Sequence, residues 1–118
     1  MSITVSPNNN RKYCEEHKLV EIQVLDPVED AYQIKVCKMS EIKYYPFEMR
    51  LANANFEYLC CVLGIEFDHC GRVDPKLVLE RLGAIDKYVF SYQDKSYHRE
   101  LKKIADEAVK RNEIIVWG

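Results

Sequence analysis

The fold is decided by residues 47–82, which read FEMRLANANFEYLCCVLGIEFDHCGRVDPKLVLERL. From Phe47 to Leu51 apolar and charged residues alternate, which predicts a strand with one buried face. Asn53 and Asn55 follow, and asparagine is a favoured N-cap because its side-chain oxygen accepts a hydrogen bond from a free helix N–H. The stretch therefore begins with a strand that turns into a helix at an Asn-x-Asn corner.

Two helices are predicted after this corner. In the first, apolar residues recur at the spacing of one helix face, and Gly64 is suited to end the helix in the left-handed conformation. Asp74 and Pro75 then form a typical helix start, with an N-cap before a proline at the first helical position. Gly83 is predicted to end this second helix.

The chain before this stretch predicts a tail and a hairpin. Residues 1–12 are rich in polar and turn-forming residues, which predicts a flexible N-terminal tail. Residues 19–25 alternate, and Ile22 lies on the face that is predicted to be buried. Residues 31–38 alternate again, so the two runs are expected to pair as an antiparallel hairpin with a loop of about five residues.

A long helix and a short strand close the chain. The helix is predicted from Asp94 or Ser96 to about Arg111, because apolar residues recur along it at helical spacing. Asn112 is suited to cap its C-terminus. Residues 114–117 are wholly apolar, as expected of a central strand.

Together these elements predict an α+β fold. We expect a small mixed sheet of about four strands with an N-terminal β-hairpin, and three α-helices packed on the sheet. Residues 13–118 are expected to form one α+β domain, because no linker or repeat divides them.

The composition excludes several classes of protein. Hydrophobic residues make up 47% and charged residues 31% of the 118 residues, which is typical of a globular domain. The net charge is −2 and the pI about 5.9, so no basic field attracts nucleic acid or an anionic membrane. The N-terminus lacks the apolar segment of a signal peptide, so we expect a cytoplasmic protein unless a non-classical route secretes it. Five cysteines, an odd number, predict free thiols rather than a disulfide framework.

Several short motifs in residues 47–118 carry a resemblance. They are Leu51-x-Asn53-x-Asn55, Leu63-Gly64, Cys70-Gly71, Asp74-Pro75-x-x-Val78-Leu79-x-Arg81-Leu82, Tyr97 with Leu101, Ala105 and Ala108, and the closing Val116-Trp117-Gly118. With these motifs the chain resembles a family of small bacterial proteins of unknown function. The resemblance implies a shared fold and no particular activity.

The most reactive group of neighbouring side chains is Asp68-His69-Cys70. A thiolate beside an imidazole is a candidate nucleophile or ligand, and the alternative is a polar turn with a buried thiol. Cys14 and His17 have the spacing of half a zinc site, but a structural zinc site needs two such pairs. The sequence therefore predicts no metal and no cofactor.

Two further groups are candidates for binding. Asn53 and Asn55 are candidates to bind a ligand at a helix N-terminus, where free N–H groups attract anions, and capping is the alternative. Four tyrosines that flank the predicted elements are candidates to contact a partner protein, because tyrosine combines a large apolar body with a polar tip. They are Tyr44, Tyr45, Tyr88 and Tyr92.

Two functions follow as hypotheses. The first is a small cytosolic, non-enzymatic regulator that binds another protein, such as an inhibitor of a larger enzyme or an effector-type regulator of a ubiquitin-modifying enzyme. The second is a small enzyme or ligand-binding protein whose site is formed by Asn53, Asn55, His69 and Cys70. We also expect a homodimer, because the apolar strand 114–117 needs cover on both faces and the hairpin has open edges.

Overall fold

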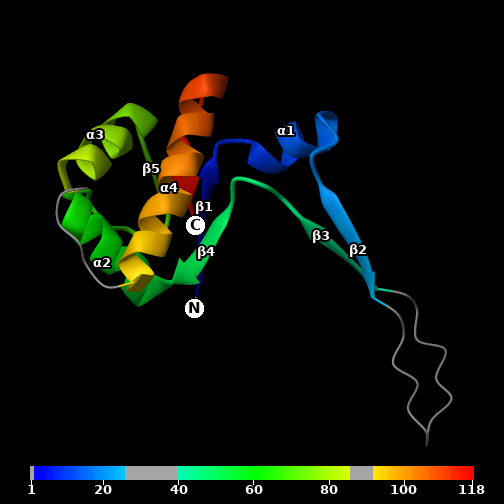
Figure 1. The fold of residues 1–118 in the computed structure, drawn as a ribbon, viewed down its shortest axis with the longest axis horizontal. Coiled ribbons are helices and arrows are strands. Elements are labelled where there is room, and N and C mark those ends of the chain that lie inside the picture. The colour runs from blue at the N-terminus through cyan, green and yellow to red at the C-terminus, as the bar shows by residue number, and fades with distance from the viewer. Residues whose placement is uncertain (1, 26–39, 86–91) are drawn as a thin grey trace, which may run out of the picture. The chain divides into compact units, whose positions relative to one another are not determined.

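The computed structural model describes residues 2–25, 40–85 and 92–118 (Figure 1). Their elements, in chain order, are β1 (Ser2–Pro7), α1 (Asn10–Glu16), β2 (Glu21–Leu25), β3 (Ser40–Tyr44), β4 (Met49–Ala52), α2 (Asn53–Leu63), β5 (Gly71–Val73), α3 (Pro75–Ile85), α4 (Tyr92–Arg111) and β6 (Ile115–Trp117). They form two compact units. The larger unit holds residues 1–10 and 47–118, and the smaller unit holds residues 11–46.

The larger unit is built on a four-stranded sheet in which the first and last strands of the chain are neighbours. The strand order is β4-β1-β6-β5, and every pair is antiparallel. Ile3 lies opposite Leu51. Val5 lies opposite Met49 on one side and Trp117 on the other. These five side chains share one face of the sheet, and all are buried.

Three helices cover this apolar face (Figure 1). α4 contacts β1 and β6, α2 contacts β4 and β1, and α3 packs on α4. The buried face of α2 is formed by Phe56, Leu59, Cys60 and Leu63, and that of α4 by Leu101, Ile104, Ala105 and Ala108. Both stripes have the helical spacing that the sequence predicted. None of the helices in the described residues is long and apolar enough to cross a bilayer.

Two helices end as the sequence predicted. Gly64 follows α2 with a φ of 67°, and Ile65 N–H donates a hydrogen bond to a carbonyl oxygen in the last turn of the helix. Asn112 follows α4 with a φ of 56°, and Glu113 N–H donates to the Ala108 carbonyl oxygen at 2.8 Å. In both cases a left-handed residue turns the chain while the free carbonyl groups keep partners.

Trp117 joins β6 to β5 because its ring packs directly on a glycine. Gly71 lies opposite Trp117 in the sheet, and a Cβ atom at Gly71 would lie 2.4 Å from the tryptophan ring. Only glycine therefore leaves room for the ring. The indole Nε1 donates a hydrogen bond to the Asp68 carbonyl oxygen at 2.9 Å, and Phe56 lies against the ring with the centroids 5.3 Å apart.

The smaller unit holds most of α1 and a two-stranded sheet formed by β2 and β3. The strands are antiparallel, with Gln23 opposite Ile42 and Ile22 opposite Lys43. The Tyr44 hydroxyl donates a hydrogen bond to Gln23 Oε1 at 3.1 Å. Gln23, Ile42 and Tyr44 thus share one face of this sheet, and Ile22 and Lys43 lie on the other.

The structure differs from the prediction at the N-terminus and in the strand directions. Residues 2–7 fall in the predicted tail, yet they form β1, which is paired on both sides. Ile3, Val5 and Pro7 alternate with small polar residues and are buried, and this short pattern outweighs the turn-forming asparagines that follow. The predicted mixed sheet is wrong, since all pairs between described strands are antiparallel.

The hairpin and the helices also differ from the prediction. β2 pairs with residues 40–44, and residues 31–38, the partner that the sequence predicted, lie outside the described residues. Ile22 is exposed rather than buried. The described residues form four helices instead of three, because α1 begins within the predicted tail. Gly83 does not end α3, which continues to Ile85, since one glycine weakens a helix without breaking it.

Asn53 is not the N-cap of α2. The helix begins at Asn53 itself, and the capping position is Ala52, which has an extended backbone and makes no side-chain cap bond. β4 ends at Ala52, so the chain passes from strand to helix with no residue between them to supply a polar cap. At α3 the predicted cap is confirmed, because Asp74 Oδ1 accepts a hydrogen bond from Lys76 N–H at 2.9 Å.

Replacement of the two predicted caps is expected to have different effects. Asp74→Ala removes a bonded cap, and we expect it to lower the free energy of unfolding by about 1 kcal/mol. Asn53→Ala removes no cap bond, and we expect a change within about 0.5 kcal/mol. Urea unfolding of both variants measures the difference. A loss at Asn53 as large as that at Asp74 would contradict the observed start of α2.

Substitution of Gly71 tests the packing of Trp117. Gly71→Ala is expected to lower the free energy of unfolding by about 1–3 kcal/mol, because the added methyl group overlaps the ring. Gly83→Ala is the matched control, since no atom lies within 4 Å of a Cβ added there, and alanine is expected to stabilise the helix by about 0.5–1 kcal/mol. The fluorescence of the single tryptophan follows unfolding in both variants. Effects of the same sign would argue against this packing.

Candidate functional site

The Asp68-His69-Cys70 turn leads into β5 and makes several structural contacts. The Asp68 carbonyl oxygen accepts the hydrogen bond from Trp117 Nε1, and the Asp68 carboxylate accepts one from the His69 N–H at 2.8 Å. The His69 ring lies edge-on to Phe67, with the centroids 5.7 Å apart. Cys70 is exposed, so the alternative of a buried thiol in this turn is wrong.

The two asparagines at the start of α2 differ in their contacts. Asn55 Nδ2 donates a hydrogen bond to the Tyr97 hydroxyl at 3.3 Å, which ties the first turn of α2 to α4. Asn53 is the first residue of the helix and supplies no cap bond. Asn55 therefore has a structural partner far along the chain, which the sequence did not predict.

The asparagines and the His69-Cys70 pair lie at opposite edges of the sheet. Asn53 follows β4 at one edge, and Cys70 precedes β5 at the other. Three strand spacings of about 4.8 Å separate these edges, about 14 Å in all. In the part of the chain that the structure describes, no hydrogen bond or ring contact links Asn53 or Asn55 to His69 or Cys70. A ligand that contacts all four must span this distance, so their shared site stays a prediction.

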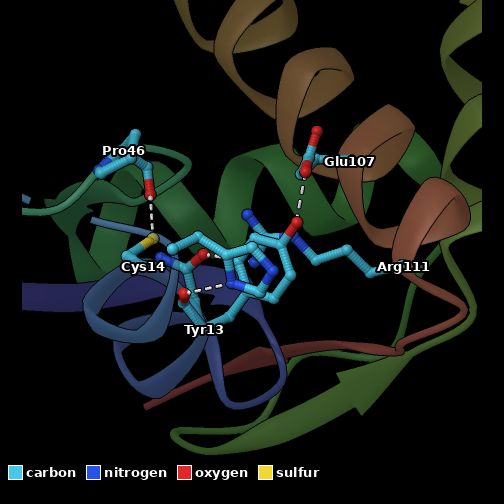
Figure 2. A network of polar contacts seen from close by, with 7 residues as sticks. Tyr13, Cys14, Pro46, Glu107 and Arg111 are labelled. Carbon is cyan, nitrogen blue, oxygen red and sulfur yellow. Dashed lines mark hydrogen bonds and ion pairs between the residues drawn. The ribbon is translucent and has the colours of Figure 1, made fainter. Parts of the chain in front are cut away.

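Cys14 and His17 have partners within the smaller unit. Cys14 is buried, and its Sγ donates to the Pro46 carbonyl oxygen at 3.8 Å (Figure 2). The His17 ring stacks on Tyr13 with the centroids 3.9 Å apart, and His17 Nδ1 lies 2.9 Å from the Tyr13 carbonyl oxygen. Among residues 2–25, 40–85 and 92–118, no three His, Cys, Asp or Glu side chains gather closely enough to hold a metal ion.

Of the four candidate tyrosines, the structure describes the side chains of Tyr44 and Tyr45. Tyr44 lies on β3 and is exposed. The Tyr45 hydroxyl donates a hydrogen bond to Glu15 at 2.8 Å. Tyr88 lies outside the described residues, and Tyr92 is the first residue of α4, with a side chain that the structure does not describe.

The sequence did not predict that other apolar residues of the smaller unit are exposed as well. Leu19, Ile22 and Ile42 are all exposed in the smaller unit. Alternation places the apolar residues of a strand on one face, but it does not tell whether that face is covered. The feature of the sequence that indicates exposure is the small number of strands predicted in this segment, because a two-stranded sheet buries little apolar surface by itself.

A buried polar cluster lies at the end of α4 (Figure 2). Arg111 Nε donates to Glu107 Oε1 at 2.9 Å, and Arg111 Nη1 donates to Asn10 Oδ1 at 2.8 Å. The guanidinium also lies over the Phe47 ring, 5.2 Å from its centroid. Asn10 and Phe47 are the residues at which the chain leaves and re-enters the larger unit. The cluster therefore joins the two residues of the larger unit that flank the segment 11–46.

The buried Cys60 beside the exposed Cys61 gives a test based on pH. Burial raises the pKa of the Cys60 thiol to about 11. Because the thiolate is the reactive form, iodoacetamide at about pH 8 is expected to modify Cys61 and Cys70 in the folded protein and to leave Cys60 unmodified. Tandem mass spectrometry locates the modified residues. In urea Cys60 and Cys61 should react alike, and equal rates in the folded protein would contradict the burial of Cys60.

The same pKa shift predicts how stability depends on pH. The ordinary pKa of the thiol is 9.0 and the folded value is about 11. The protonated thiol therefore stabilises the fold fully below about pH 9, and this contribution is lost as the pH rises to about 11. Urea unfolding of the wild-type protein and of Cys60→Ala across this range measures it, and the variant should lose less stability. Equal losses in the two proteins would contradict the shift.

Comparison of the chain with models of protein families, with curated proteins and with solved structures gives no match. The resemblance to a family of small bacterial proteins therefore stays a prediction. The function has to be argued from the geometry of the chain itself.

Proposed function

We propose that this chain is a small, non-enzymatic module that binds another protein through the hairpin formed by β2 and β3. The exposure of large apolar side chains in the smaller unit carries the proposal. Ile22 is 57% exposed and Tyr44 is 49% exposed, and Leu19 and Ile42 are exposed as well. Groups of exposed apolar residues mark surfaces that contact other proteins, whereas single ones are ordinary.

The exposed residues lie on both faces of the hairpin. Ile42 and Tyr44 are two residues apart on β3 and share one face, while Ile22 lies on the other. The hydrogen bond from Tyr44 to Gln23 fixes the tyrosine hydroxyl on its own face. A two-stranded sheet is marginally stable by itself in water, so contact with a partner would stabilise the hairpin as well as the complex.

The size of these side chains allows each of them to contribute to the free energy of binding. Complete burial of one such side chain stabilises a complex by about 1.5–3 kcal/mol relative to its exposed state. Several of them together offset part of the entropy lost on association, which is at least about 4 kcal/mol. Tyrosine is also among the residues that most often dominate the energy of protein interfaces.

Two of the four side chains that were candidates for chemistry have structural partners, which supports a binding role over a catalytic one. The His69 ring packs on Phe67, and Asn55 bonds to Tyr97. Inhibition of a larger enzyme, including a ubiquitin-modifying one, is a narrower form of this proposal, and only the identity of the partner decides it. Cytoplasmic location and membership of the small bacterial family are further proposals.

The binding surface can be tested with two tyrosines of equal exposure. Tyr58 lies on α2 in the larger unit and is 52% exposed, so it is a matched control for Tyr44. A photo-crosslinking amino acid at position 44 is expected to attach to one protein in native cytosol, and the same amino acid at position 58 is not. Mass spectrometry identifies the attached protein.

Affinity for the attached protein then measures the contribution of the hairpin. Tyr44→Ser and Ile22→Ser are each expected to weaken binding about tenfold or more, which corresponds to about 1.4 kcal/mol. Tyr58→Ser is expected to leave the affinity unchanged. Thermal unfolding of all three variants is the control that checks that each of them keeps the fold. Equal cross-linking from positions 44 and 58, or equal affinities of Tyr44→Ser and Tyr58→Ser, would overturn the proposal.

A further inference from the structure

We infer that the outer edge of β3 pairs with β3 of a second copy of the chain, so that two hairpins form one four-stranded antiparallel sheet. Among the described strands β3 pairs only with β2. Within the part of the chain that the structure describes, its other edge has no partner strand, and such an edge is a row of backbone N–H and C=O groups that can pair with a further strand. This edge is distinct from the hairpin faces to which the proposed function assigns binding of another protein.

The sequence of β3, Ser-Glu-Ile-Lys-Tyr, is self-complementary about its central residue. A two-fold axis at Ile42 places Ile42 of one copy opposite Ile42 of the other. The same axis sets residue 41, a glutamate, opposite residue 43 of the other copy, a lysine, and symmetry repeats this pair. Facing apolar residues and facing opposite charges both stabilise an antiparallel pair of strands.

The outer edge of β2 would form apolar pairs but no pairs of opposite charge. A two-fold axis at Gln23, the centre of β2, sets Glu21 opposite Leu25 of the second copy and Ile22 opposite Val24. The charged Glu21 of each copy would then face the apolar Leu25 of the other copy, and no pair of opposite charges would form. The sequence therefore favours β3 as the edge that self-associates. Because a two-fold contact uses the same edge of both copies, pairing through β3 stops at a dimer.

Pairing through β3 would also enlarge the face that carries Tyr44. Residues directly opposite each other share a face, so Ile42 and Tyr44 of both copies would lie on one face of the four-stranded sheet. The dimer expected from the sequence was based on the hairpin edges and on the apolar strand 114–117, and the latter, β6, has no free edge. Both edges of β6 are already paired, with β1 and β5.

Charge reversal tests this register on the purified full chain. The monomer mass is 13.9 kDa, and light scattering at high micromolar concentration is expected to give twice that value. Glu41→Lys sets lysine opposite lysine, and Lys43→Glu sets glutamate opposite glutamate. Each single variant is expected to raise the dissociation constant of the dimer on the order of tenfold or more. Glu21→Lys, on β2, is the control and should leave the dimer intact.

Mixing the two single variants gives the decisive result. Glu41→Lys supplies two lysines and Lys43→Glu two glutamates, so a mixed dimer regains both opposite-charge pairs, and a mass of two chains is expected to return. Monomeric wild-type protein, single variants that dimerise as well as the wild type, or no recovery on mixing would each overturn the inference. Each measurement uses the chain alone, so its failure leaves the cross-linking result at Tyr44 unaffected.

Discussion

The contact between Trp117 and Gly71 is the interaction on which the larger unit depends. Trp117 belongs to the last strand of the chain, lies opposite Val5 of the first strand, and covers a position in β5 where any side chain would collide with its ring. Its Nε1 fixes the turn at Asp68. Both ends of the chain thus contribute to this core, and contacts between distant parts of the sequence close it.

Arg111 explains how a separate hairpin unit is inserted into this sheet. A buried guanidinium is costly unless it is well paired, and Arg111 pairs with Glu107 and Asn10. Phe47, under the same guanidinium, has a φ of 61°, a conformation that aromatic residues seldom adopt. One side chain thus contacts both residues of the larger unit that flank the segment 11–46.

The sequence predicted best those elements whose signals are local. Asp74 caps α3 and Gly64 forms the left-handed turn after α2, as the sequence predicted. Both features depend on only a few neighbouring residues. β1 was not predicted, because its short alternating pattern does not specify a strand by itself. The strand is stabilised by pairing with β4 and β6, which come from distant parts of the chain. The same limit applies to the candidate site. His69 and Cys70 were candidate site residues because they are neighbours in the sequence. Only the strand order of the sheet shows that they lie at the edge opposite Asn53.

Alternation has opposite consequences in the two units. In β1 and β4 the apolar residues face helices and are buried, so the pattern contributes stability. In β2 and β3 the same pattern leaves Ile22, Ile42 and Tyr44 exposed, so the apolar area that would stabilise a core is available for association instead. This difference in burial between the two units is the observation that supports the proposed binding of another protein through the hairpin.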